Sequence, residues 1–156
     1  MKTTIRNCSV VLVVALFASS AFAKTCSAVG GAILTDLGGF GVIDSSPTTL
    51  GVATGDLKGA LGVQILSASS DFTSLTVQHH WVTDSGESLA IDPATVHGVF
   101  VAPGLLAVTA YKVHLSGGSG RFAHATGDLS SIGEVDFNTG HAVLRYSGTV
   151  CYYDTR

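Results

Sequence analysis

The sequence predicts an all-β domain, built either as a sandwich or as a barrel of antiparallel strands. Residues 71–83 and 141–153 alternate between two kinds of side chain, which is the two-residue period of a half-buried strand. Glycine, proline and asparagine punctuate the chain at fairly regular intervals, as turns between short strands require. After residue 23 no segment has a convincing 3.6-residue period, so we expect strands throughout.

The first 23 residues have the three parts of a signal peptide. Lys2 and Arg6 give a positive start, residues 9–20 are apolar and uncharged, and residues 21–23 (AFA) form an A-x-A cleavage site. The apolar run is too short to span a membrane, and no second run of spanning length follows. We therefore expect export, to a periplasm or out of the cell, and one mature domain of residues 24–156 without a membrane span.

The charge balance of the mature chain argues against a nucleic-acid partner. Residues 1–23 hold two of the eight basic residues and none of the eleven acidic ones, which leaves the mature chain six basic and eleven acidic residues, a net charge of −5. No basic patch suited to a phosphate backbone stands out. The low charge and high apolar content are typical of an ordered β domain rather than a disordered chain.

The first half of the mature chain contains three predicted strands before the clearest one. Residues 28–37 end at a cluster of glycines, residues 48–53 follow a loop that contains Pro47, and residues 59–69 place apolar side chains on alternate positions. A helix is the competing interpretation of residues 59–69, but two glycines weaken it.

Residues 71–83 form the clearest strand, and its two faces separate by alternation. One face holds Leu75, Val77, His79 and Trp81, and the other is mostly polar. The strand ends at the tight turn of residues 84–86 (DSG), which predicts a hairpin.

Turn signals divide the second half of the chain in the same way. Proline cannot donate to a strand ladder, so Asp92-Pro93 predicts a bulge or loop between two strands. Further turns fall at residues 102–104 (APG) and 138–140 (NTG). The predicted strands are residues 87–91, 95–101, 105–116, 128–137 and 141–153.

The glycine-rich segment GGSGRFAHATG, residues 117–127, has two interpretations. It comes close to a dinucleotide-binding fingerprint, but the residues after it make a poor helix, and the Gly-Lys-Ser/Thr ending of a P-loop is absent. The alternative is a corner of backbone in which glycines adopt positive φ, Phe122 packs inward, and Arg121 stays solvated or pairs with a carboxylate. We expect this structural turn, and no cofactor. Its residues are Gly117, Gly118, Gly120, Phe122 and Gly127.

With the strand, turn and strand that follow it, this segment resembles the GGTGRFAGATG-type signature of the allene oxide cyclase/dirigent β-barrel superfamily. The resemblance is strongest to small exported bacterial relatives. It covers about residues 55–153, including GDLKG, HHWVTDSGES and GEVDFNTGHAVLRYSGTV, with Ser119 where threonine is usual and His124 where glycine is common. It implies a single antiparallel eight-stranded barrel with an apolar cavity, often in a homodimer or homotrimer. Because the motif is a structural corner, the resemblance implies no catalytic residue.

Two cysteines remain after signal cleavage, one near each end of the mature chain. Cys26 and Cys151 are expected to form a disulfide, since paired cysteines are usual in exported proteins and first and last strands are neighbours in a closed barrel. Such a bridge could contribute up to about 4–5 kcal/mol in the chain-entropy model. The alternatives are two buried free thiols or a metal site, and the latter lacks a C-x-x-C partner or a nearby histidine.

The histidines do not predict a local metal site. His79 and His80 are adjacent on a strand, so their side chains point to opposite faces. The other four lack the i, i+2 or i, i+4 spacing of a zinc site, and we expect no metal unless strands assemble one across the sheet. His79 shares a face with Trp81; it is a catalytic candidate, with a hydrogen-bonded structural histidine as the alternative.

Glu134 and Asp136 share one face of a predicted strand, and Arg145 lies on the strand that follows. If that face were the barrel interior, the three would form a polar cluster in an apolar pocket and would be catalytic candidates with shifted pKa values. The alternative is a solvated outer face. A serine hydrolase is not predicted, because no G-x-S-x-G elbow occurs.

These observations support three functional hypotheses. The first is an exported barrel that binds an apolar or aromatic small molecule in its lumen, with Trp81, Tyr111 and Tyr146 as candidate contacts. The second, which the resemblance implies, is a cyclase, isomerase or dirigent-type protein that steers closure of a reactive intermediate by holding its conformation. The third is an envelope structural or interaction protein whose lumen is filled by side chains.

Overall fold

A computed structural model describes residues 24–37, 42–43 and 46–153 of the chain, so the predicted signal peptide of residues 1–23 lies outside the described residues. The described part is almost entirely β structure, with two short 3-10 helices, and contains no helix long and apolar enough to cross a membrane. Its elements are β1 (Lys24–Asp36), β2 (Val42–Ile43), β3 (Ser46–Ala53), η1 (Gly55–Leu57), β4 (Gly59–Ala68), β5 (Ser74–Thr83), β6 (Ser88–Ile91), β7 (Ala94–Ala102), β8 (Leu105–Gly118), η2 (Gly120–Phe122), β9 (Thr126–Asp136) and β10 (His141–Tyr153).

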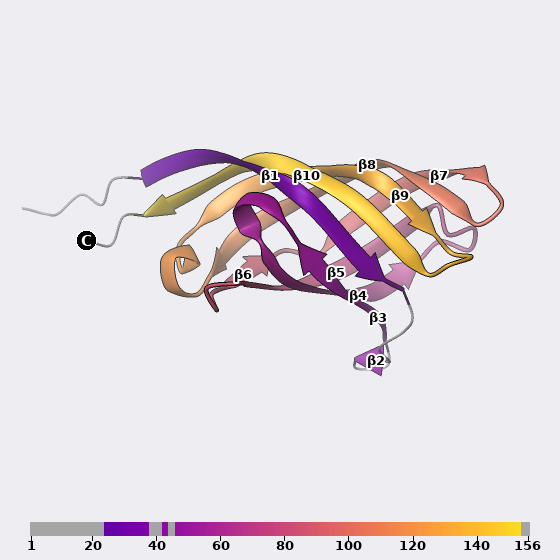
Figure 1. Cartoon of the computed structure of the whole chain (residues 1–156), viewed down its shortest axis with the longest axis horizontal. Helices are drawn as coiled ribbons and strands as arrows, with labels where there is room; N and C mark the ends of the chain where they lie inside the picture. Colours follow the sequence, from indigo (N-terminus) through magenta and orange to yellow (C-terminus); the bar gives the residue numbers. More distant parts are fainter. Residues whose placement is uncertain (1–23, 38–41, 44–45, 154–156) are drawn as a thin grey trace, which may run out of the picture.

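The strands form one closed antiparallel sheet. Neighbours follow the order β1, β10, β9, β8, β6, β5, β4 and β3, and the pairing of β1 with β3 closes the circle. Figure 1 shows β1 and β10 running side by side along the molecule. The sequence pattern left sandwich and barrel open, and these pairings confirm the barrel that the resemblance predicted.

One position of the barrel is shared by two strands. β6 and β7 both pair with β5 on one side and β8 on the other, so together they act as a single interrupted strand. The interruption falls at Asp92-Pro93, as predicted from the missing proline donor. Counted this way, and with the two-residue β2 left as an appendage of β3, the barrel has the expected eight strands.

The predicted strands lie close to the observed ones, and the largest difference is at the start of the chain. β1 begins at Lys24 rather than at residue 28, because β10 extends to Tyr153 and supplies a pairing partner for every residue of β1. The segment KTCS is polar and exposed, so its sequence contains no alternation from which pairing could be predicted.

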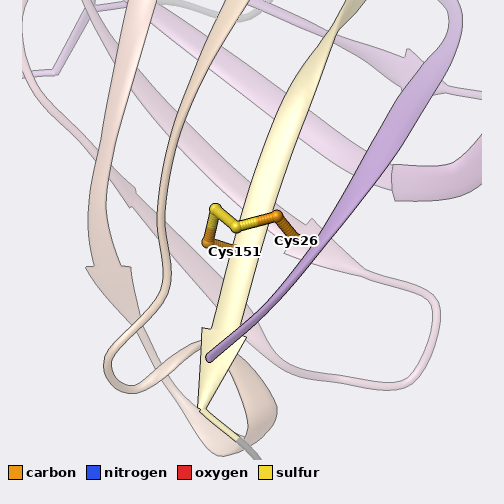
Figure 2. The surroundings of a disulfide bond; sticks show 2 residues. All are labelled: Cys26 and Cys151. Carbon is orange, nitrogen blue, oxygen red and sulfur yellow. A yellow bond between two sulfur atoms is a disulfide. The ribbon is translucent and has the colours of Figure 1, made fainter. Parts of the chain in front are cut away.

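The predicted disulfide is confirmed. Cys26 lies directly opposite Cys151 in the register of β1 and β10, and the two sulfur atoms are bonded. In Figure 2 the bridge crosses from one strand to the other. It therefore ties the first strand of the barrel to the last, near the two ends of the described chain.

One end of the barrel is packed, and the glycine-rich corner contributes to it. Gly118 has a φ of 152°, and a side chain there would meet the carbonyl oxygen of Ser88 at 2.1 Å from Cβ. This close approach lets η2 place Phe122 fully inside the barrel end, with no exposed surface. Arg121 stays outside and pairs with Glu87, at 3.0 Å from Nε to Oε2.

Loss of the disulfide should destabilise the barrel without changing its strands. We expect Cys26→Ser, Cys151→Ser and the double variant each to lower the free energy of unfolding by about 4 kcal/mol, because loss of the bridge opens a loop of 125 residues and so raises the conformational entropy of the unfolded chain. Urea unfolding with and without a reducing agent measures this. A reductant should affect only the wild type, and an unfolding midpoint that the reductant leaves unchanged would contradict the prediction.

Candidate functional site

The other half of the barrel is hollow. A cavity of about 420 Å³ opens towards the β4–β5 and β9–β10 connections, whose residues Phe72 and Phe137 line it. In Figure 1 these connections lie at the end of the barrel away from η2. Its lining is mainly apolar and none of it carries a formal charge at neutral pH. The strand residues that line it include Ile33, Leu61, Val63, Ile65, Leu75, Val77, Val96, Val108, Val135 and Leu144.

This cavity follows from the alternation of the strands. On β5 the inward positions are Leu75, Val77 and His79, and the outward position next to them, His80, is exposed. The same alternation on the neighbouring strands turns branched aliphatic side chains towards the axis. The interior of an eight-stranded barrel is just wide enough to be filled by side chains or to hold one small ligand. Here the inward aliphatic side chains are too small to fill this half, and the cavity remains.

Two polar side chains meet within the apolar lining. Tyr111, on β8, and His79, on β5, both line the cavity, and each is at most 7% exposed. The Tyr111 hydroxyl is hydrogen-bonded to Nε2 of His79, and the two rings stack with centroids 5.7 Å apart. The structure therefore brings together the catalytic candidate His79 and the candidate ligand contact Tyr111, which the sequence left separate.

Burial keeps both members of this pair neutral. Removal from water, with a smaller contribution from the neighbouring His80, lowers the pKa of His79 from 6.5 to about 4. Burial raises the pKa of Tyr111 above its usual value of 10. At neutral pH the lumen thus contains an uncharged imidazole and an uncharged phenol.

Two buried polar atoms near the cavity lack a hydrogen-bond partner among the described residues. They are Nδ1 of His79 and Oγ1 of Thr49, and both residues line the cavity. The register places Thr49 opposite Val63 and Val63 opposite His79, so the three lie in one row across β3, β4 and β5. Sequence reasoning missed Thr49, because a threonine is an ordinary strand residue and nothing in the pattern marks it.

The other two candidate ligand contacts lie in the packed half of the barrel. Trp81 Nε1 donates to the carbonyl oxygen of Leu57 at 2.9 Å, and the Tyr146 hydroxyl donates to the carbonyl oxygen of Thr54 at 2.8 Å. Tyr146 also accepts from the backbone N–H of Leu57 at 3.0 Å. Their ring centroids are 5.6 Å apart. Neither side chain lines the cavity, and their polar atoms are occupied in holding η1.

The candidate acidic cluster is not assembled. Glu134 and Arg145 are exposed, and the register places them opposite Val143 and Ile132 respectively. Asp136 accepts hydrogen bonds in the β9–β10 turn, from the backbone N–H of Asn138 at 2.8 Å among others. These three residues lie on the side of β9 and β10 away from the lumen, and none of them lines the cavity.

Aromatic side chains surround the mouth of the cavity. Phe72 and Phe137 line it, with ring centroids 6.2 Å apart, and Phe100 lies 6.1 Å from Phe137. Phe72 is 52% exposed and has a φ of 57°, a conformation that a bulky residue rarely adopts. The Asp71 carboxylate stabilises this turn by accepting from Ser69 Oγ and from the backbone and side chain of Thr73. The sequence does not indicate the strained backbone of Phe72 or its place at the mouth of the cavity.

Metal ligands are not grouped in the part of the chain that the structure describes. No set of three or more histidine, cysteine, aspartate or glutamate side chains there could hold an ion. Cys26 and Cys151 are bonded to each other in the disulfide.

Comparison with known proteins gives distant likenesses to solved structures. No family model matches the chain, and no curated protein matches it. Among solved structures, the pterocarpan synthase dirigent protein GePTS1 aligns with a TM-score of 0.41 and 13% identity, over 92% of this chain and 100% of that one. The pterocarpan synthase dirigent protein PsPTS1 aligns with a TM-score of 0.34 and 12% identity, over 85% and 97%. The strand pairings themselves establish the closed antiparallel barrel, and these likenesses assign no residue a role.

The buried His79 should make the protein sensitive to mild acid. Above pH 6.5 the imidazole is neutral in both folded and unfolded chains, whereas between pH 6.5 and about 4 only the unfolded chain takes up its proton. Stability should therefore fall as the pH falls through this window, by a total of about 3 kcal/mol. Urea unfolding across this range should show the loss in wild type and in His80→Gln, the exposed neighbour. An equally steep loss in His79→Gln would contradict the assignment.

Proposed function

We propose that the barrel binds an apolar small molecule in its lumen. The observation that carries this proposal is the cavity of about 420 Å³ with an uncharged lining, which lies within the range of roughly 300–1,000 Å³ usual for small-molecule pockets. Burial of apolar ligand surface there would supply most of the binding free energy, at about 25 cal/mol per Å². The polar pair of His79 and Tyr111 offers one place where a ligand could be oriented.

The aromatic mouth supports the same proposal. Phe72, Phe100 and Phe137 are exposed on one end of the barrel, where burial in the protein core does not account for them. Exposed apolar groups beside a pocket are typical of a ligand entrance. The strained backbone of Phe72 adds to this, because strain of this kind persists where function requires it.

A second candidate is a protein that steers closure or isomerisation of the bound molecule. One observation favours it: the lumen contains two titratable side chains, His79 and Tyr111, in direct contact. A neutral phenol and imidazole can pass a proton to or from a bound intermediate, while the cavity walls hold its conformation. A ligand that leaves the protein chemically changed would distinguish this function from binding alone. A purely structural role is less well supported, since it predicts a lumen filled by side chains.

Filling the lumen should abolish uptake of an apolar probe. We expect the uncharged dye Nile red to bind wild type with a blue-shifted emission, and Val63→Phe, which projects into the cavity, to bind at least tenfold more weakly. Val82→Phe is the matched control, because Val82 is an exposed residue on the outer face of β5. A fluorescence titration of the three proteins measures the dissociation constants.

Equal affinity of Nile red for wild type and Val63→Phe would place the dye outside the lumen and contradict the proposal. Retention of binding in Val82→Phe shows that an added phenyl group on the exterior is tolerated.

We also propose that the mature domain, residues 24–156, is exported and self-associates. The disulfide fits an oxidising compartment. An outer apolar patch of Leu34, Val52 and Val143 supports association, since these exposed residues are in register on β1, β3 and β10. A homodimer or homotrimer would bury this patch.

Native mass spectrometry of protein exported by its own leader tests both parts. We expect a subunit mass that begins at Lys24 and an assembly of two or three subunits. Leu34→Glu should shift the assembly to monomers, because it places a charge in the outer apolar patch, whereas Thr149→Glu, at another exposed position of β10, should not. An intact leader would contradict export, and a monomeric wild type would contradict association.

A further inference from the structure

The polar pair in the lumen contains more hydrogen-bond donors than it uses. A neutral imidazole carries one N–H and a phenol carries one O–H, so His79 and Tyr111 together hold two polar hydrogens. One hydrogen bond joins them, between the Tyr111 hydroxyl and Nε2 of His79. One polar hydrogen is therefore left over, either on Nδ1 of His79 or on the Tyr111 oxygen.

The burial of Nδ1 decides between these two arrangements. This atom is fully buried and has no hydrogen-bond partner among the described residues. A proton on Nδ1 would thus be an isolated buried donor, which is the rarer and costlier of the two kinds of unpaired group. The favoured tautomer places the proton on Nε2, which then donates to the phenolic oxygen of Tyr111.

In this arrangement the spare donor is the Tyr111 hydroxyl. Its oxygen accepts from His79, so its own proton is free to turn away from the imidazole, and accepting one hydrogen bond strengthens the donation of the next. Tyr111 lines the cavity, whereas the bare Nδ1 does not reach solvent. The raised pKa of Tyr111 keeps this proton on the oxygen at neutral pH.

The lining also limits the charge of an occupant. Apart from His79 and Tyr111, the residues that line the cavity are apolar or carry hydroxyl groups, and none is charged at neutral pH. An anion or a cation would lose its hydration without gaining a counter-charge. A neutral molecule without an acceptor could also enter the lumen, but it would bind less tightly because it would leave the Tyr111 proton unpaired.

We propose, on the basis of the lumen-binding function above, that the ligand is an uncharged apolar molecule with a hydrogen-bond acceptor such as a carbonyl oxygen, and that the Tyr111 hydroxyl donates to it. His79 is a positioning residue, because its Nε2–H fixes the direction of the Tyr111 proton. The lumen should therefore prefer a ketone to the hydrocarbon of the same shape.

A matched pair of probes tests this preference. 2-Acetylnaphthalene and 2-isopropylnaphthalene have nearly the same shape, and only the first has an acceptor. We expect wild type to bind the ketone about tenfold more tightly than the hydrocarbon after correction for their water solubilities. One neutral hydrogen bond to an otherwise unpaired buried donor is enough for a difference of this size. In Tyr111→Phe the preference should fall to within about twofold, with little change for the hydrocarbon.

Tyr152→Phe provides the matched control. Tyr152 is a partly buried tyrosine whose ring packs against Phe122 in the closed half of the barrel, and it does not line the cavity. Its variant should keep the wild-type preference. A preference of the same size in Tyr111→Phe, or none in wild type while both naphthalenes bind, would overturn the inference and leave the lumen-binding function standing. If neither naphthalene nor Nile red binds, both fall.

The tautomer can be measured without any ligand. Nitrogen-15 chemical shifts of the His79 ring at pH 7 distinguish a proton on Nε2 from one on Nδ1. We expect the proton on Nε2, and a proton on Nδ1 would overturn the inference whatever the probes show. Since this measurement uses the wild-type protein, it does not depend on whether Tyr111→Phe folds.

Discussion

Closure of the sheet by β1 is the constraint on which the rest of the structure depends. β1 pairs with β10 along its whole length but with β3 only over its last four residues, so part of its other edge needs different partners. The segment around η1 supplies them: Gly30 N–H donates to Asp56 Oδ2 at 2.8 Å, and Ala32 N–H donates to Thr54 Oγ1 at 3.1 Å. These contacts complete the wall at the place where the strand pairing runs out. The Cys26–Cys151 bridge fastens the same strand to β10. With the wall closed, alternation along every strand sends one set of side chains to a common axis.

The two ends of that axis differ because their connections differ. At the closed end, η1 and η2 bring backbone carbonyls and an aromatic ring into the barrel, so Trp81 and Tyr146 find partners and Phe122 fills the space between strands. At the open end, the β4–β5 and β9–β10 turns place Phe72 and Phe137 around the mouth instead of deep inside the barrel. Branched aliphatic side chains alone do not fill the axis there, and the cavity remains. At the closed end, the buried polar atoms of Trp81 and Tyr146 form hydrogen bonds with protein atoms. At the open end, Nδ1 of His79 and Oγ1 of Thr49 have no hydrogen-bond partner among the described residues.

Alternation let the sequence predict which face of a strand is buried, but not how deep along the barrel a residue lies. His79 and Trp81 are two positions apart on the same inward face, and one lines the cavity while the other is locked against η1. Depth depends on the stagger between strands, which is a property of pairing and not of one strand. The Cys26–Cys151 pairing was predictable because it rests on the closure of the barrel, which makes the first and last strands neighbours. The contact between His79 and Tyr111 joins residues 32 positions apart on strands separated by the split β6–β7 position, and no local pattern encodes it.

The outward placement of Glu134 and Arg145 and the neutrality of the lumen have one cause. The inward positions of β9 include Leu129, Ser131 and Val135, so alternation assigns the acidic residues of that strand to the solvent side. A carboxylate in the lumen would lose its hydration beside aliphatic walls, which is unfavourable. Attraction to a paired arginine would offset this desolvation free energy only if the geometry of the pair were good. The titratable groups that face the cavity are therefore a histidine and a tyrosine, which can remain uncharged when buried. Under the proposed lumen-binding function, an interior of this kind would recognise its occupant by shape and by a single directed hydrogen, and an ion would find no counter-charge there. Selectivity would then come from the cost of leaving that hydrogen unpaired, so the hydroxyl of Tyr111 would discriminate between ligands more strongly than the apolar residues around it.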